Sequence, residues 1–162
     1  MEIQKIQIPV KQGLKIISGM IKLSYLCEYM NRSSGWIYNK MNHAETSTTS
    51  VGFNEKDIAD INTAIAEIGS TLLGKRIIPK DNPDIDIKSR REDIVRQLKE
   101  VALIVSMPYI YVEKLGKDKI WYAKRIANGS RYKFSENDIL TMNMAIVEIG
   151  SKLLSIELTM QE

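Results

Sequence analysis

The chain has 162 residues, of which 44% are apolar and 27% charged, the ordinary balance of a globular protein with one domain or two small ones. Its single cysteine, Cys27, excludes an internal disulfide and a thiolate zinc cage, and no apolar run reaches the roughly 18 residues that span a bilayer. The net charge of +3 permits nucleic acid as a partner without requiring it, so we expect a soluble, cytoplasmic protein that makes no membrane contact.

The first elements predicted from the sequence are a helix in residues 14–22 and a helix-turn-helix unit in residues 23–42. The segment LSYLCEYMNRSSGWIYNKMN has apolar residues at helical spacing, a polar break, and a second short helix centred on Trp36. Asn31 occupies the turn, because asparagine and glycine tolerate a left-handed backbone best. Cys27 is expected in a small buried slot where the two helices approach each other.

A long helix is predicted for residues 53–73, FNEKDIADINTAIAEIGSTLL, and its start is well marked. Asn54 is a good N-cap, and Asp57 three positions on completes the pattern of a capping box, with Asp in place of the usual Glu. One stripe of the helix is apolar, at the spacing of Ile58, Ile61, Ile65, Ile68 and Leu72. This stripe either packs in the core of its own unit, which we favour, or forms a seam with a second long helix.

Residues 76–90 hold two prolines and dense charge and are predicted to be a linker. The chain beyond this linker repeats the part before it. Residues 134–154, FSENDILTMNMAIVEIGSKLL, are identical to residues 53–73 at 13 of 21 positions without a gap. Residues 110–126, IYVEKLGKDKIWYAKRI, match residues 25–41 at an offset of 85. In this alignment Trp121 falls on Trp36, Gly116 on Asn31 and Val112 on Cys27.

The repeat predicts an all-α fold of two tandem helix-turn-helix units, residues 1–75 and 91–162, related by a pseudo-twofold axis. Each unit is expected to carry a short extended loop or wing after its second short helix, and in the second unit this is ANGSRYKF (127–134). A duplication in one chain supplies the geometry of a dimer, and covalent linkage lets two weak halves bind one target. We therefore expect a monomer that acts as a pseudo-dimer, or a weak homodimer.

The pattern LSYLCEYMNRSSGWIYNKMN followed by FNEKDIADINTAIAEIGSTL resembles the small, largely uncharacterised helix-turn-helix domains of gut Bacteroidetes and their mobile elements. A leucine-serine-tyrosine start, an S-x-W helix and a capped final helix recur in that family. More loosely, the pattern is similar to phage-repressor-type DNA-binding domains. The resemblance covers most of each copy and implies DNA binding. The chain departs from the motif where apolar residues are usual: Arg32 or Lys117 follows the turn, and Lys40 or Arg125 lies near the end of the second helix.

In a helix-turn-helix protein the start and outward face of the second helix read bases, while flanking basic groups hold phosphates. This predicts sequence-specific binding of double-stranded DNA and a role in transcriptional regulation. The candidate DNA-binding residues are Arg32, Ser33, Ser34, Tyr38, Asn39 and Lys40 in the first unit, and Lys117, Lys119, Lys124, Arg125, Arg131 and Lys133 in the second. Asn39 is the candidate for a bidentate contact with adenine, and Arg131 and Lys133 would contact phosphate from the wing.

The two units are not electrostatically equal. Residues 114–133 contain seven basic side chains and one acid, whereas the matching residues 29–52 contain two basic side chains and one acid. The second unit is therefore the expected phosphate-binding half, and the first is a reader or a structural partner. The weak charge of the first unit also favours an alternative from another class. This is a protein-protein interaction module that binds a repressor or replication factor without DNA contact, which an exposed apolar groove would support.

Catalysis is not expected from this sequence. The only histidine, His43, lies in a polar loop that has no counterpart in the second copy. Cys27 fits a buried structural thiol better than a nucleophile. We find neither a phosphate-binding glycine loop nor metal-ligand spacing, so no cofactor and no metal are predicted.

Overall fold

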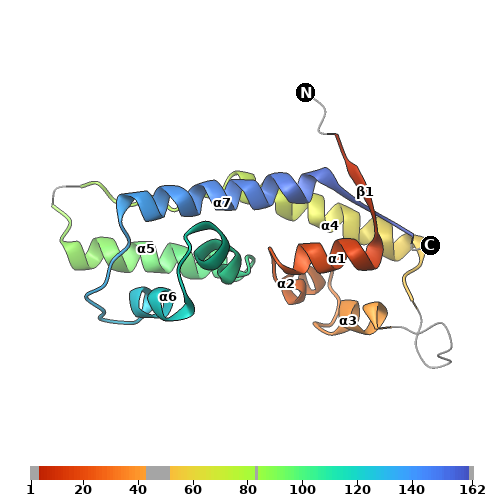
Figure 1. Cartoon of the computed structure of the whole chain (residues 1–162), viewed down its shortest axis with the longest axis horizontal. Helices are drawn as coiled ribbons and strands as arrows, with labels where there is room; N and C mark the ends of the chain where they lie inside the picture. Colours follow the sequence, from red (N-terminus) through yellow and green to blue (C-terminus); the bar gives the residue numbers. More distant parts are fainter. Residues whose placement is uncertain (1–3, 43–51, 83, 161–162) are drawn as a thin grey trace.

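The computed structural model describes residues 4–42, 52–82 and 84–160. In chain order its elements are β1 (Ile6–Pro9), α1 (Val10–Ser18), α2 (Leu23–Tyr29), α3 (Trp36–Met41), α4 (Glu55–Leu73), α5 (Ile87–Ala102), the π-helix η1 (Tyr109–Lys114), α6 (Lys119–Ile126), α7 (Glu136–Ser155) and β2 (Ile156–Thr159). Helices make up most of the described chain, as predicted. Two short strands form a small sheet that the all-α prediction missed (Figure 1).

The two long helices, α4 and α7, form the centre of the molecule. They lie side by side and run in opposite directions, with α1, α2 and α3 grouped near α4 and with α5, η1 and α6 grouped near α7 (Figure 1). Their apolar stripes are buried, at Ile61, Ile65, Ile68 and Leu72 of α4 and at Met142, Ile146, Ile149 and Leu153 of α7. The stripe that was assigned to the core therefore also lies in the contact between the two long helices.

This contact is close at Gly69 and Gly150, which align with each other when residues 53–73 are compared with residues 134–154. A Cβ atom added at Gly69 would lie 2.9 Å from the carbonyl oxygen of Gly150, and one added at Gly150 would lie 2.8 Å from the carbonyl oxygen of Gly69. Neither helix can accept a side chain here unless a backbone moves. Glycine at both positions is therefore what lets the buried stripes of the two helices meet at native packing density.

Both long helices begin with the predicted capping box. The Asn54 side chain accepts a hydrogen bond from the Asp57 backbone N–H at 2.8 Å, and the Asp57 carboxylate accepts one from the Asn54 backbone N–H at 3.1 Å. Ser135 and Asp138 make the same pair of bonds at 3.0 and 2.9 Å. Two backbone donors at each helix start are thereby satisfied, so that Asp in place of Glu completes the box.

Two asparagines at matching positions fix the chain that follows the long helices. Asn62 on α4 donates a hydrogen bond to the carbonyl of Leu158 at 3.0 Å and accepts one from its N–H at 2.8 Å. Asn143 on α7 makes the same two bonds with Ile77, at 2.9 and 2.7 Å. Each asparagine thus binds the backbone that follows the opposite long helix, and both bound residues are buried.

The small sheet consists of β1 and β2, which pair in parallel with Ile6 opposite Ile156 and Pro9 opposite Thr159. The sheet packs closely on α1 at Gly13. A Cβ atom on Gly13 would lie 2.1 Å from a methyl carbon of Leu158, so a side chain at this position would force the buried leucine side chain to move. Apolar alternation over four residues is too short a signal to separate such a strand from a helix start.

The segment predicted as a linker, residues 76–90, is attached to the rest of the fold. Ile77 is buried, and the Gln97 side chain of α5 binds both the N–H and the carbonyl of Ile78, at 2.8 and 2.9 Å. The segment also contains the start of α5, since Asp86 caps that helix by accepting from the Ser89 N–H at 2.7 Å.

Replacing Gly69 by Ala should lower the free energy of unfolding by about 1–3 kcal/mol, because the new methyl group overpacks a backbone–backbone contact. Urea denaturation followed by circular dichroism measures this change. Gly74→Ala is the matched control, since Gly74 ends the same helix and a Cβ atom there has no neighbour closer than 3.7 Å. Equal midpoints for the two variants would contradict the role assigned to Gly69.

Candidate nucleic-acid interface

The first unit carries its two short helices, α2 and α3, on either side of a tight turn. Asn31 has a positive φ of 58°, the left-handed conformation that its place in the sequence predicted. The following helix begins only at Trp36, so Arg32, Ser33 and Ser34 lie in the turn before it and not in its first helical turn. Fully buried Ile37 attaches α3 to the core.

Cys27 on α2 is fully buried, as predicted, and its thiol lies by the backbone of Ile37. Burial raises the pKa of the Cys27 thiol, and a hydrogen bond with the Ile37 backbone opposes this rise. A thiol with a raised pKa holds little thiolate near neutral pH and is a poor nucleophile. The cysteine therefore serves to pack α2 against α3.

The second unit reaches the same arrangement with one more residue. In the sequence, residues 14–23 align with residues 98–107 at an offset of 84, whereas residues from Met30 onward align at an offset of 85. The extra residue is absorbed in η1, whose π-helical turn holds one residue more than an α-helical turn. The Leu115 N–H accordingly bonds to the carbonyl of Ile110, five residues back. Gly116 then has a φ of 65°, matching Asn31.

The extra residue corrects one prediction. Val112 was expected to share the buried slot of Cys27, but its side chain is 47% exposed. Tyr111 is buried in its place and stacks on buried Tyr122 of α6, with ring centroids 4.9 Å apart. Burial raises the pKa of Tyr122 to about 12, so this tyrosine stays neutral. A tyrosine pair in the second unit thus fills the space that Cys27 and Ile37 fill in the first.

Two cations flank the tryptophan of the first unit. The Arg32 guanidinium lies 4.9 Å and the Lys40 ammonium 5.7 Å from the Trp36 ring centroid. Lys40 also forms an ion pair with the nearly buried Asp57 at 3.3 Å and donates to the carbonyl of Gly52 at 3.1 Å. Lys40 therefore joins α3 to the start of α4, and its charge is partly neutralised.

The tryptophan of the second unit has the same surroundings. The Lys117 ammonium lies 5.9 Å and the Arg125 guanidinium 4.2 Å from the Trp121 ring centroid. Arg125 donates to the carbonyl of Lys133 at 3.2 Å and to that of Trp121 at 3.0 Å. Because Gly52 and Lys133 each precede the phenylalanine before a long helix, Arg125 makes the contact that Lys40 makes in the first unit. The predicted interface residues Lys40 and Arg125 are thus engaged inside the fold.

The other predicted residues differ in exposure. Arg32 is half-buried, and its guanidinium lies 3.9 Å from the Asp60 carboxylate. The exposed candidates are Ser33, Ser34, Tyr38 and Asn39 in the first unit and Lys117, Lys119, Lys124, Arg131 and Lys133 in the second. The second unit thus presents five exposed cations, while the exposed candidates of the first unit are all uncharged.

The loop expected to form a wing, residues 127–134, contains no strand and is held by Arg91 of α5. The Arg91 guanidinium donates to the carbonyl groups of Arg125, Ala127 and Tyr132 at 2.6, 2.7 and 2.9 Å. The ring of Tyr132 lies 5.4 Å from both the Lys124 and the Arg131 cations. Arg91 directly follows the predicted linker, in a run of charged residues, and was not among the candidate residues, so sequence reasoning missed its role in holding the basic loop.

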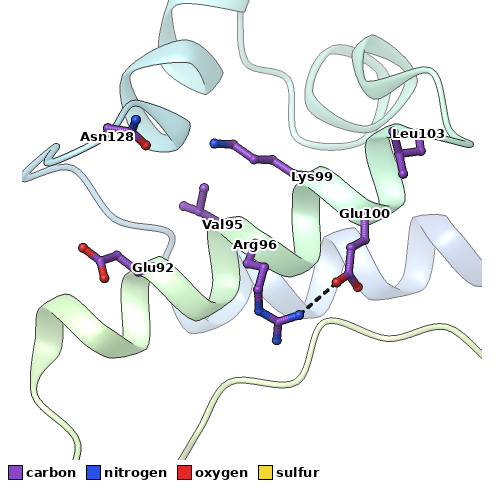
Figure 2. A pocket seen from close by; sticks show the side chains of 7 residues that line it. All are labelled: Glu92, Val95, Arg96, Lys99, Glu100, Leu103 and Asn128. Atoms are coloured by element: carbon purple, nitrogen blue, oxygen red, sulfur yellow. Dashed lines mark hydrogen bonds and ion pairs between the residues drawn. The ribbon is translucent and has the colours of Figure 1, made fainter.

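A groove of about 460 Å³ adjoins this loop on the outer face of α5. Figure 2 shows Lys99 extending from α5 toward Asn128, while Arg96 and Glu100 bond to each other at 2.9 Å. The Arg96 and Glu100 charges offset each other, and Lys99 is left as the cation beside Asn128. Glu92 also lines the groove, so its two acidic and two basic side chains balance and the basic surface of the second unit does not extend into it.

An ion pair between Lys114 of η1 and Glu148 of α7 joins these two helices. The Glu148 carboxylate accepts from Lys114 at 2.8–2.9 Å and from Lys152 at 3.0 Å, and Tyr109 also lies within hydrogen-bond distance. These cations hold the pKa of Glu148 well below its usual value, at about 2. In the first unit the matching Glu67 accepts from the hydroxyl of Tyr29 instead.

Two further expectations concern groups outside this surface. His43, predicted to be a solvated loop residue, lies outside the described residues together with most of its loop. Among residues 4–42, 52–82 and 84–160, no three metal-ligating side chains come together. None of the helices in these same ranges is long and apolar enough to cross a membrane.

Glu148→Gln should remove a pH-dependent part of the stability. Because the folded pKa lies below the usual value of 4.5, ionised Glu148 stabilises the fold above about pH 4.5, and this contribution is lost as the pH falls toward 2. The side chain is 36% exposed, so after solvent screening we expect a difference of about 1 kcal/mol at pH 7. Urea melts at pH 7, 4 and 2 measure it, with Glu113→Gln, an exposed glutamate in η1, as control. A difference that persists at pH 2 would contradict the assignment.

Comparison with known proteins covers the first unit. Residues 10–75 match the model of a family described as a domain of unknown function, DUF5053. The matched residues run from the first residue of α1 to just beyond the end of α4. Searches of curated proteins and of solved structures gave no significant match. The first unit, with α1 to α4, is therefore similar to an uncharacterised domain.

Proposed function

We propose that the chain binds double-stranded DNA as a single-chain pseudo-dimer and acts as a transcriptional regulator. The observation that carries the proposal is the placement of α3 and α6. Both short helices follow a left-handed turn, and both lie on the same side of the α4–α7 pair, one under each end of the molecule (Figure 1). Two helices presented on one side are what a protein needs to enter successive major grooves.

Reciprocal contacts support the pseudo-twofold relation between the units. The backbone N–H of Lys22 donates to the carbonyl of Ile104 at 2.8 Å, and the backbone N–H of Ser106 donates to the carbonyl of Met20 at 2.8 Å. These two bonds flank the antiparallel bridge between Ile21 and Val105. Each donor and acceptor lies at an offset of 84 from its counterpart. The exchanged asparagine bonds and the facing glycines of the long helices are reciprocal in the same way. A pseudo-twofold axis would therefore pass between α4 and α7.

The exposed residues of the two units are suited to different contacts with DNA. Lys119, Lys124 and Arg131 of the second unit supply charge for phosphate contacts, which carry most of the salt-dependent affinity. Tyr38 and Asn39 on α3 are exposed and uncharged, and Asn39 can pair with adenine through two hydrogen bonds. In this proposal the second unit holds the DNA backbone and the first reads bases.

The second candidate function is binding of a protein, such as a repressor or replication factor, without DNA contact. The observation that favours it is exposed apolar surface on the second unit, where Ile120 of α6 is 64% and Leu103 after α5 is 66% exposed. Exposed apolar side chains mark protein contacts when they form a continuous patch. The five exposed cations on and beside α6 favour DNA over this alternative.

Fluorescence anisotropy with a labelled random-sequence duplex at about 50 and 200 mM salt tests the proposal. We expect binding that prefers duplex to single strand and weakens steeply with salt. Replacing Lys119, Lys124 and Arg131 together by Ala should weaken binding and flatten the salt slope by about 0.9 for each phosphate that the variant no longer neutralises.

The matched control removes the same charge elsewhere, by replacing Lys5, Arg76 and Lys80 with Ala. These residues lie before β1 and in the segment after α4, which Figure 1 shows on the side away from α3 and α6. The control should keep the slope of the unmodified protein. Equal slopes for the two triple variants, or no binding at the lower salt, would reject the DNA proposal and direct the search to a protein partner.

A further inference from the structure

One edge of the chain after α7 is covered by a strand, whereas the matching edge after α4 is occupied only at Ile78, by the Gln97 side chain. In the repeat, residues 75–78 correspond to β2 at residues 156–159. Asn62 binds Leu158 from one side, and β1 pairs along the other side of β2. The residues that align with β1, 90–93, belong to α5, which begins two turns earlier in this alignment than α1 does, so no strand of the described chain pairs along residues 75–78.

The backbone of residues 75–78 offers hydrogen bonds on that edge. Asn143 occupies the N–H and carbonyl of Ile77 on one side. In an extended chain neighbouring residues point to opposite edges, so the groups of Arg76 and Ile78 face the other side. The Gln97 side chain binds the backbone N–H and carbonyl of Ile78. The backbone N–H and carbonyl of Arg76 have no hydrogen-bond partner within the described part of the chain.

A cavity of about 520 Å³ lies along this edge, between the end of α4, the segment 74–78 and α5. Its α5 wall contains Gln97, Glu100 and Val101, which the offset of 84 aligns with Gly13, Ile16 and Ile17 of α1. β1 lies against α1 and β2 in the first unit, so the cavity occupies the corresponding place in the second. The space is bounded by the same kinds of elements but holds no strand of the described chain.

We infer that this cavity is a binding site for an extended segment of a partner protein, which displaces the Gln97 side chain from Ile78 and adds in parallel to residues 75–78 as β1 adds to β2. Strand addition to an exposed edge is a general mode of peptide recognition, in which main-chain bonds give affinity and alternate side chains give specificity. β1 itself, Ile-Gln-Ile-Pro, supplies the pattern: apolar residues alternate with a polar one, and a proline ends the pairing.

The charge of Arg76 determines which ligand residue is favoured between the two apolar positions. In the sheet, Gln7 lies opposite Glu157, and the position that matches Glu157 is Arg76. Arg76 is exposed, and its guanidinium makes a local bond to the carbonyl of Lys75. Lys75 adds a second positive charge to the edge. A ligand with an acidic residue between the two apolar ones should therefore bind better than one with a basic residue, because opposite charges across strands attract.

The test uses two labelled peptides that copy residues 5–10 with Gln7 replaced, KIEIPV and KIKIPV, in anisotropy titrations with the full chain. We expect KIEIPV to bind about five-fold more tightly, the size of an exposed ion pair. Arg76→Glu should reverse this order, because it changes the sign of the charge opposite the variable residue. Circular dichroism and a thermal melt of the variant show that the exposed substitution leaves the fold intact.

Glu157→Lys is the matched control at the corresponding position of β2, where the chain's own β1 already pairs. It should leave the preference for KIEIPV unchanged, since the peptide binds at the other edge. No saturable binding of KIEIPV, or a preference that Arg76→Glu does not reverse, would overturn the inference. Self-association of the chain that Arg76→Glu abolishes would also overturn it, because a second copy would then be the occupant. None of these outcomes depends on DNA binding.

Discussion

The close approach of α4 and α7 at Gly69 and Gly150 is the contact on which the rest of the arrangement depends. Each glycine faces the backbone of the other helix at a distance that leaves no room for a Cβ atom. At this separation the apolar stripes of the two helices interdigitate, and each asparagine reaches the chain beyond the opposite helix. A wider spacing would break four bonds to that chain and separate the two units. α3 and α6 are attached to this pair through α2 and η1, which pack on α4 and α7.

The two units also show how a fold accepts an extra residue. Insertion into an α-helix would rotate every following side chain by about 100° and turn buried positions outward. η1 avoids this because its π-helical turn absorbs the residue locally, and the left-handed Gly116 and the helix α6 keep their places. The side chains that pack between the short helices change as a consequence. Tyr111 and Tyr122 there replace the smaller Cys27 and Ile37, so the packing between the short helices is repeated in position but not in chemistry.

The sequence was most informative where one local interaction decides the structure. The capping boxes, the left-handed turn residues and burial of Cys27 were predicted correctly, because each depends on residues a few positions apart. The strands were missed because their pairing joins residues about 150 positions apart. At the candidate interface, charge and motif position selected Lys40 and Arg125, yet both cations bind carbonyl oxygens of the chain before a long helix. Arg91 was missed for a related reason, since a sequence shows that a residue is basic but not which distant loop its side chain reaches.

The two units match in some contacts and differ in others. Contacts that fix backbone positions are retained even where the side chains change: Lys40 and Arg125 make one such contact, and Tyr29 and Lys114 bind the matching glutamates in another. The exposed candidate residues of the short helices differ in charge, with uncharged side chains on α3 and cations on α6. A homodimer cannot separate its two surfaces in this way, because every substitution appears in both subunits. Because both units belong to one chain, the pair of long helices can present an uncharged face on α3 and a basic face on α6.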